Sequence, residues 1–571
     1  MEDAFPAVSL VQAGNGRSFD WPKLPAETHT FLLACFLKGF LWAIENPPQR
    51  CIVMRHILSI VLILVIAVLG LGQPSFTPCN DTGPRIRKPW SLLTTRDKWV
   101  YVNAVADAMA AGFHQRFVEI HTEPSTSYEA HGCMFLYWHR KFLLAYENML
   151  RSLKPDYACL TIPYWDYATL SSQYVARSCT SMYQCATDVI NYFGGTVDST
   201  GLSSWSPING NAIGGNGCVQ RFPLNNYCQS SSAVQTHTCM RCLPRNDYST
   251  ATVPPEINIV PVFAQIFGGP TLRSMSDGVQ LGCHNNIHSK LASVMAQMES
   301  PADPLFLLHH VQQRGQIDLM HRIFFKCRVA DAGVKGNIPV LTDAQKRNAN
   351  DPRLWTSCTR LNGTTINPTD PVRMLGGEFG QPKIDVHDPA SPLYTYFKDL
   401  PRPYYMYADG DDMGSFSHRY IYTGMLADML TQCAAYIAPK GASLLSSNYG
   451  NDVNPSYVDR CVDRPRLTCE RTQTSFIDYV SRLAGDLGWS HGHLTAQIEA
   501  MVCAHHNECL GGVRDFSASF KASFHPNGPP RCKVIMDRLE SNRMFINLPN
   551  WRTVVARFFP CPNTTATVAT S

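Results

Sequence analysis

Two groups of three histidines, each on segments with helical patterning, constrain this 571-residue chain more than any other feature. In the later group, His284 and His288 are four residues apart, which places both imidazoles on one face of a helix. His310 follows in the segment SPADPLFLLHH, where Asp303 is a good N-cap and Pro304 a good first helical residue. Three neutral imidazoles from two packed helices form a nitrogen-only site suited to copper or zinc.

The earlier group comprises His121, His131 and His139, and the last of these lies in an aromatic and aliphatic segment, 135–143. A second histidine triad predicts a second metal ion. Zinc hydrolases generally add a carboxylate ligand or a general-base glutamate, and carboxylate-bridged iron pairs need Glu-x-x-His repeats. Neither pattern accompanies these histidines, so the two triads favour a dinuclear copper centre in an apolar helical bundle.

Amino-acid composition narrows the classes of protein to which this chain can belong. Apolar residues make up 45% and charged residues 16%, so the chain can bury a large core. The net charge of +4 is too small to indicate a nucleic-acid partner. Apolar residues recur at helical spacing in four segments, which are 95–120, 135–150, 283–298 and 304–325.

Cysteine content indicates the compartment. The chain has 21 cysteines, and from Cys79 to Cys561 they are spaced along its whole length, which favours disulfides and an oxidising environment. Three N-x-S/T sequons predict glycosylation in the secretory route, at Asn80, Asn362 and Asn563. Cys239 and Cys242 are interpreted as disulfide-bonded rather than as a redox or zinc half-site, and 503–509 as a short disulfide loop rather than a metal site.

The apolar run at 57–71 predicts an export signal. It follows Met54-Arg55-His56 and ends in small residues, and it is short for a membrane span of roughly 20 residues. We interpret 54–72 as a signal peptide that starts at Met54, and 1–53 as an extension of undetermined function. The alternative is a signal anchor of a type II membrane protein. Both interpretations place most of the chain outside the cytosol.

Four motifs carry a family resemblance: W-H-R-x-F-L-x-x-Y-E at 138–147, P-Y-W-D at 163–166, H-N-x-x-H at 284–288 and D-P-x-F-x-x-H-H at 303–310. In this order they resemble the tyrosinase, catechol oxidase and molluscan-type haemocyanin family, and within it the secreted invertebrate-type tyrosinases. Arg87 and the tyrosine-rich segment 404–407 support the resemblance. It implies a mainly α fold, with a helical copper-binding domain at 85–410 and a Cys-rich C-terminal region at 411–571.

The resemblance also implies the ligands, which are His121, His131 and His139 for the first copper and His284, His288 and His310 for the second. The pattern FV-x-x-H at 117–121 favours His121, and His114 is an alternative first ligand. Phe306 and His309 would pack beside the site.

One departure from the family concerns Asp318. The family aspartate lies one turn after the paired histidines, whereas Asp318 lies eight residues after His310. Four extra residues add about 6 Å of helix, which argues against pairing of Asp318 with Arg140 unless a kink at Gly315 absorbs them. Some relatives also link a copper ligand to a cysteine, but we expect Cys133 and Cys283 to be free or disulfide-bonded.

The implied activity is oxygen-dependent oxidation of phenols at two copper ions, with ortho-hydroxylation of monophenols such as tyrosine and oxidation of diphenols to o-quinones. Asn285 directly follows a ligand, where the family's monophenol-active members often hold a water that deprotonates the phenol. Gln280 stands near the place of the glutamate that shares this water, and an amide polarises it less than a carboxylate. Alternatives are catechol oxidation only, or haemocyanin-like oxygen binding without turnover.

The expected substrates are small phenols or protein tyrosines, used for melanin-type pigment or for protein tanning. A membrane partner is expected only if 57–71 remains as an anchor, and no nucleic acid is expected. The oligomeric state stays open. In this family C-terminal regions often cover the active site, and 411–571 is a candidate for that role.

Overall fold

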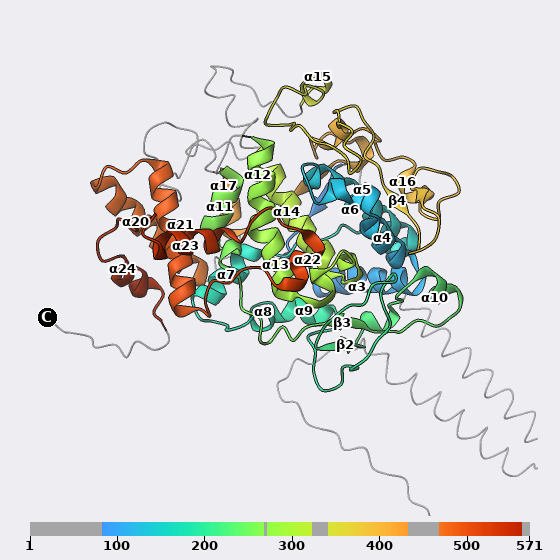
Figure 1. Ribbon diagram of the computed structural model, residues 1–571, viewed down its shortest axis with the longest axis horizontal. Helices are drawn as coiled ribbons and strands as arrows, with labels where there is room; N and C mark the ends of the chain where they lie inside the picture. The colour runs from blue at the N-terminus through green and yellow to red at the C-terminus, as the bar shows by residue number, and fades with distance from the viewer. Residues whose placement is uncertain (1–82, 268–270, 322–340, 432–467, 562–571) are drawn as a thin grey trace, which may run out of the picture. The chain divides into compact units, whose positions relative to one another are not determined.

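The computed structural model describes residues 83–561 with the exception of 268–270, 322–340 and 432–467 (Figure 1). The described residues all belong to one compact unit, 78–571. The predicted extension, the predicted signal sequence and the sequons at Asn80 and Asn563 lie outside the described residues.

Eight helices carry the segments that hold the two histidine triads or pack beside them. They are α3 (Thr95–Ala110), α4 (Phe113–Thr122), α5 (Pro124–Ala130), α6 (Phe135–Leu153), α11 (Ile259–Phe267), α12 (Leu272–Val279), α13 (Asn285–Leu291) and α14 (Leu305–His321). Helix α6 is central, since almost its whole length is buried, including the charged side chains of Arg140, Lys141 and Glu147. The predicted mainly α fold is confirmed.

Backbone chemistry explains where these helices begin and end. Thr94 and Asp97 form a capping box at the start of α3. The helical pattern over 95–120 is divided into α3 and α4 because Gly112 adopts a left-handed φ of 78°. Asp303 caps α14 by accepting a hydrogen bond of 3.0 Å from Leu305 N, as its position predicted.

Short strands tie distant segments of the described chain together. Strand β1 (Arg85–Arg87) pairs in parallel with β6 (His418–Tyr420). Strands β2 (Gly217–Val219) and β3 (Leu243–Arg245) form an antiparallel pair, as do β4 (Leu375–Gly376) and β5 (Ile384–Asp385). The arginines of β1 pair with buried Glu147 on α6, so β1 and β6 are anchored to the central helix.

The remaining helices are shorter or lie in the C-terminal region. Within the first 431 residues they are α7 (Tyr167–Val175), α8 (Met182–Cys185), α9 (Thr187–Tyr192), α10 (Ser231–Gln235), α15 (Asp343–Lys346), α16 (Tyr394–Phe397) and α17 (Gly424–Thr431). The C-terminal helices are α20 (Thr468–Asp486), α21 (His491–Cys509), α22 (Ala518–Phe524), α23 (Arg531–Glu540) and α24 (Trp551–Phe558).

The C-terminal helices pack on helices earlier in the chain through buried polar contacts. On α20, the Gln473 amide donates to Asn258 Oδ1 at 2.6 Å and accepts from Ser172 of α7 at 2.7 Å. Farther along the chain, Ser517 N donates to Ser289 Oγ at 3.0 Å, which fixes the start of α22 beside α13 (Figure 1).

Six disulfides join described residues: Cys133–Cys358, Cys179–Cys185, Cys218–Cys242, Cys228–Cys239, Cys503–Cys532 and Cys509–Cys561. They confirm the disulfide-rich character, and Cys239 and Cys242 are both disulfide-bonded, as predicted. The short loop predicted at 503–509 is wrong. Residues 503 and 509 both lie on α21, where six residues rise about 9 Å, too far for one bond.

Among the described residues, every helix is either too short or too polar to cross a membrane.

Candidate metal centre

Three helical segments bring the first histidine triad together. His121 lies in the last turn of α4, His131 ends α5, and His139 projects from α6. The ring centroids are 4.7 Å apart for His121 and His131, 5.6 Å for His121 and His139, and 6.1 Å for His131 and His139. The three imidazoles therefore face one small volume.

The second triad is assembled by η6, α13 and α14. Here η6 (Gln280–His284) is a π-turn that ends at His284. The centroid of His284 lies 4.6 Å from that of His288 and 5.0 Å from that of His310. The Nε2 atoms of His288 and His310 are 3.4 Å apart. The triads adjoin, because His139 stacks on His310 at 4.2 Å.

Hydrogen bonds orient five of the six rings through Nδ1. The partners are main-chain oxygens of Met298 for His121 (2.6 Å), Ser127 for His131 (3.2 Å), Phe135 for His139 (3.0 Å) and Met295 for His288 (2.6 Å), and the Asn285 Oδ1 for His284 (2.7 Å). An Nδ1–H that donates to oxygen leaves the lone pair on Nε2, the atom that can bind a metal.

The protonation state also fits a metal. Burial lowers the pKa of His121, His131 and His288 to about 3, so these imidazoles are neutral, as a metal ligand must be. Burial also lowers the pKa of His284 and His310 well below the usual value.

The donor set of the described residues fits copper. The Nε2 atoms of His288 and His310 face each other, and His284, His288, His309 and His310 place ligand atoms within 4.8 Å of one another. No carboxylate belongs to this group in the described part of the chain. Six imidazoles without a carboxylate suit a pair of copper ions.

Two further histidines are excluded as ligands by their hydrogen bonds. His309 contacts the Tyr167 hydroxyl through Nδ1 and the Gln313 amide through Nε2, the latter at 2.9 Å. His114 contacts the Tyr146 hydroxyl at 2.6 Å and Ala302 O at 3.0 Å. Because both ring nitrogens of each are engaged, the geometry favours His310 and His121 as the ligands.

Aromatic rings and one ion pair enclose the centre. Phe306 lies 4.0 Å from His310 between ring centroids. Arg140 pairs with Asp318 and donates to Tyr407 O at 2.6 Å. The expectation that the extra turn prevents this pair is wrong. Helix α14 continues through Gly315, which packs against Tyr420, so the pair forms without a break in the helix.

The two cysteines nearest the ligands behave as predicted. Cys133 forms a disulfide with Cys358, and Cys283 is free and buried. Burial raises the pKa of the Cys283 thiol to about 12, so it remains protonated.

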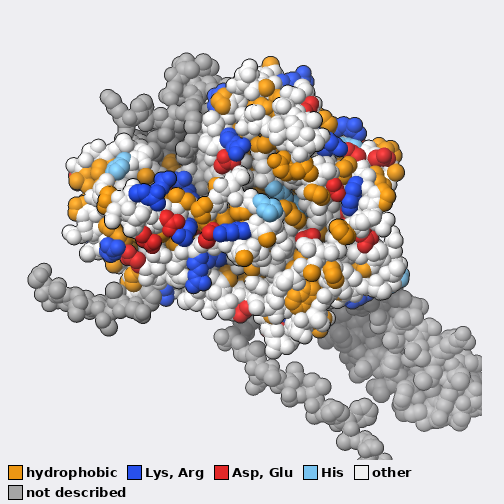
Figure 2. Space-filling view, viewed as in Figure 1, with side chains coloured by type: hydrophobic (Ala, Val, Ile, Leu, Met, Phe, Trp, Pro, Cys, Tyr) orange, Lys and Arg blue, Asp and Glu red, His pale blue; other side chains and the backbone are white. Residues whose placement is uncertain are grey.

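A small cavity opens beside the ligands and is closed by the C-terminal region. Its lining includes His131, His284, Asn285, Gln280 and Asp277 on one side and the segment 524–527 on the other. The Phe524 ring lies 5.2 Å from the His131 ring and 5.3 Å from the His288 ring, centroid to centroid. Figure 2 shows histidine side chains near the centre of this face, with hydrophobic side chains around them.

Sequence reasoning missed Phe524 as part of the site. A signal exists in the spacing of Phe516, Phe520 and Phe524, which recur every four residues and so share one helix face. The rings contact one another in series and, with Ala296, form a separate hydrophobic cluster.

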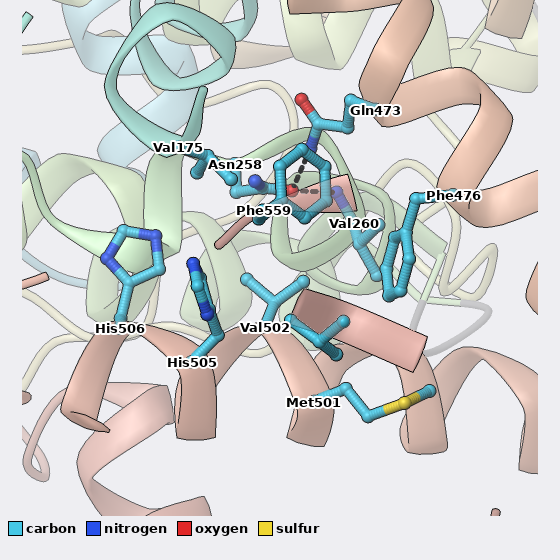
Figure 3. Close-up of a pocket in the computed structure, with 11 residues that line it drawn as sticks. Val175, Asn258, Val260, Gln473, Phe476, Met501, Val502, His505, His506 and Phe559 are labelled. Carbon is cyan, nitrogen blue, oxygen red and sulfur yellow. Dashed lines mark hydrogen bonds between the residues drawn. The ribbon is translucent and has the colours of Figure 1, made fainter. Parts of the chain in front are cut away.

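A second cavity lies away from the histidine triads, between α20, α21 and α11. His505 and His506 of α21 line it together with Gln473 and Asn258 (Figure 3). His505 also lies near the disulfide-bonded Cys509 and Cys561.

The part of the chain that holds both triads is similar in sequence to known proteins. The family model of the common central domain of tyrosinase matches residues 112–324, which contain both triads. A tyrosinase of Streptomyces lincolnensis is 30% identical over 39% of this chain and 78% of its own length. A tyrosinase-like protein of Diaporthe leptostromiformis is 25% identical over 47% of this chain and 71% of its own length.

Two further likenesses are more distant. Tyrosinase of Felis catus is 26% identical over 37% of this chain and 40% of its own length. A solved polyphenol oxidase structure from Thermothelomyces thermophila has a TM-score of 0.37 and 16% identity, with 60% of this chain and 90% of that one covered.

A mainly helical fold that gathers two histidine triads defines a class of dinuclear metal proteins. The sequence matches then make the assignment specific: this chain belongs to the tyrosinase family. It is therefore an oxidoreductase of the copper-dependent, phenol-oxidising kind.

Proposed function

We propose that this protein oxidises phenols to o-quinones with molecular oxygen, both by ortho-hydroxylation of monophenols and by oxidation of diphenols. The observation that carries the proposal is the convergence of two histidine triads, with five of the six Nδ1 atoms held by oxygen acceptors. Two copper ions would be held by His121, His131 and His139 and by His284, His288 and His310. When bound, the copper pair supplies oxygen activation and electron transfer.

The chain's own residues would orient the ligands and exclude water. The oxygen acceptors, four of them main-chain carbonyls and one the Asn285 side chain, would fix five of the rings against rotation and keep Nε2 directed at the metal. Phe135 lies 4.7 Å from His284, and Phe306 lies 5.2 Å from His121, between ring centroids. These rings leave little space for water, so polar contacts to a bound substrate are strengthened.

Asn285 would support the monophenol reaction. Its Oδ1 contacts His284 at 2.7 Å, so its Nδ2 amide is the group available to hold a water or to donate to the phenol oxygen in the adjoining cavity. A donor to the phenolate favours the charged form and so lowers the pKa of the bound phenol. Gln280 lines the same cavity and offers a second amide.

The C-terminal region, 411–571, would cover the site of the copper-binding domain, 85–410. Phe524 occupies the position over His131 and His288 from which a phenol would approach. Its helix is held by Ser517 and by a hydrogen bond between Ser523 and Gln297. The full chain would therefore be a latent form.

We further propose secretion, directed by the signal at 54–72, with glycosylation at Asn80, Asn362 and Asn563. Among the described residues, Asn362 is exposed in a loop, and its sequon threonine Thr364 contacts its side chain at 2.8 Å. The disulfides suit an oxidising compartment. Outside the cell, small phenols or protein tyrosines would be substrates, for pigment or protein tanning.

Parallel assays of the copper-loaded chain test the function. Oxygen uptake should occur with tyrosine, with a tyrosine-bearing peptide and with a catechol, after the covering segment is removed by proteolysis. Oxygen uptake with the catechol alone would show that the protein oxidises diphenols but does not hydroxylate monophenols. Reversible oxygen binding without product would indicate a carrier and contradict the proposal.

A further inference from the structure

The helix that carries His284 is interrupted immediately before this residue. The π-turn η6 lies between α12 and α13, and Gly282 within it has non-helical backbone angles, φ −88° and ψ −118°. A π-turn adds one residue to a helix, which turns all later residues by about 100° around the axis relative to an unbroken α-helix. The direction of His284 therefore depends on this turn being kept.

A buried glutamine from another helix packs against the turn and pairs with its backbone. Gln265 lies on α11 and is buried. Its Oε1 accepts a hydrogen bond of 3.1 Å from Cys283 N, and its Nε2 donates to Glu256 O at 2.7 Å. The amide is thus held at both ends, and its acceptor end is directed at the residue before His284.

Two glycines allow this close approach. A Cβ at Gly282 would lie 2.2 Å from the Gln265 Cδ, and a Cβ at Gly278 would lie 2.8 Å from the Gln265 main-chain oxygen. A side chain at Gly278 would meet the α11 backbone and push this helix away, and a side chain at Gly282 would displace the Gln265 amide. The spacing of four residues puts both glycines on the face of α12 and η6 that contacts α11.

Asn286 donates hydrogen bonds to main-chain carbonyls of the same turn. Its Nδ2 donates to Gly282 O at 2.9 Å and to Leu281 O at 3.3 Å. Gln265 therefore pairs with the Cys283 N–H of the turn, and Asn286 pairs with two of its carbonyls. Neither side chain contacts an imidazole in these hydrogen bonds, so both act through the backbone.

We propose that Gln265 and Asn286 are positioning residues for the second metal, because they hold the π-turn that directs His284. This inference rests on the proposed dicopper function. Without the Gln265 amide, Cys283 N loses its acceptor in a buried place, and the turn can relax toward an ordinary helix. His284 would then rotate away, whereas the first triad, on α4, α5 and α6, would keep its geometry.

The test uses Gln265→Met in the full chain, since methionine keeps the length of the side chain and removes both hydrogen bonds. Gln473→Met is the matched control, because Gln473 is also buried and uses both ends of its amide, in a cavity whose lining includes none of the six triad histidines (Figure 3). Copper content per chain and the affinity of the weaker site, by chelator competition, are measured together with the melting temperature.

Gln265→Met should keep one tightly bound copper and bind the second about 10–100-fold more weakly, the usual loss when a residue that orients a ligand is changed. Asn286→Ala should act in the same direction, and Gln473→Met should bind copper like the wild type. Wild-type affinity in both Gln265→Met and Asn286→Ala would overturn the inference, as would equal copper loss in Gln265→Met and Gln473→Met. A wild-type chain that binds fewer than two copper ions would overturn the proposed function as well.

Discussion

The ring of Phe524 lies 5.3 Å from the imidazole of His288 and 5.2 Å from that of His131, so one C-terminal side chain touches a proposed ligand of each metal. These contacts join α22 to the two triads, although Phe524 lies more than 200 residues beyond His288 in the sequence.

Removal of this ring should release activity. In Phe524→Ala the cavity beside Asn285 extends over the ligands, and we expect the full chain to oxidise a catechol at least about 10-fold faster, since a group that competes with substrate is lost. Initial rates with and without protease treatment measure the effect. Phe545→Ala is a control, because Phe545 is exposed and belongs to the same region. Equal rates in Phe524→Ala and the wild type would contradict a covering role.

The choice between the paired histidines can be tested by metal content. His310→Ala should bind one copper per chain, because its ring completes the second triad. His309→Gln should bind two, because His309 uses both nitrogens for hydrogen bonds to Tyr167 and Gln313. Metal analysis after dialysis decides this, and the reverse result would exchange the two assignments.

Substitution of Asn285 should slow the hydroxylation of monophenols more than the oxidation of diphenols. We expect Asn285→Gly to lower the monophenol rate by about 10–100-fold, in the range of a lost contribution to proton transfer, and to change the catechol rate less. The ratio of initial rates with tyrosine and with a catechol is the measurement. A similar fall in both rates would show that Asn285 acts only by orienting His284, with which it shares a hydrogen bond.

Glu256 should make stability depend on pH. Burial raises the pKa of this carboxyl to about 7, and its Oε1 accepts from Cys532 N at 3.1 Å. An acid whose pKa is higher in the folded protein stabilises the fold fully below its unfolded pKa of about 4.3, and this stabilisation is lost as pH rises to 7.

Glu256→Gln should therefore remove this part of the pH dependence and raise the free energy of unfolding at pH 8 by on the order of 1–3 kcal/mol. Urea unfolding of both proteins at pH 5 and pH 8 tests it, with the difference between the proteins as the readout. An identical pH dependence of the two proteins would show that Glu256 does not titrate in this range.

Local sequence patterns were sufficient for the main elements of the centre. The spacing of His284 and His288 and the cap at Asp303 are properties of single helices, so they can be read without knowledge of the fold. The helical segments followed from the same periodicity, and the family resemblance implied the mainly α fold. The disulfide loop predicted at 503–509 failed because pairing depends on which helices adjoin, and Cys503 and Cys509 each pair with a cysteine farther along the chain.

The amino-acid sequence alone thus determined the two triads, the family and the kind of chemistry, because ligand types and helical spacing are local. Only the tertiary structure decided how the site is held and covered. The acceptor for His121 is Met298 O, 177 residues away, the Arg140–Asp318 pair spans 178 residues, and Gln265 reaches Cys283 from a different helix. Such contacts leave no periodic pattern in the sequence, since their partners are brought together only by the packing of helices that are far apart in the chain.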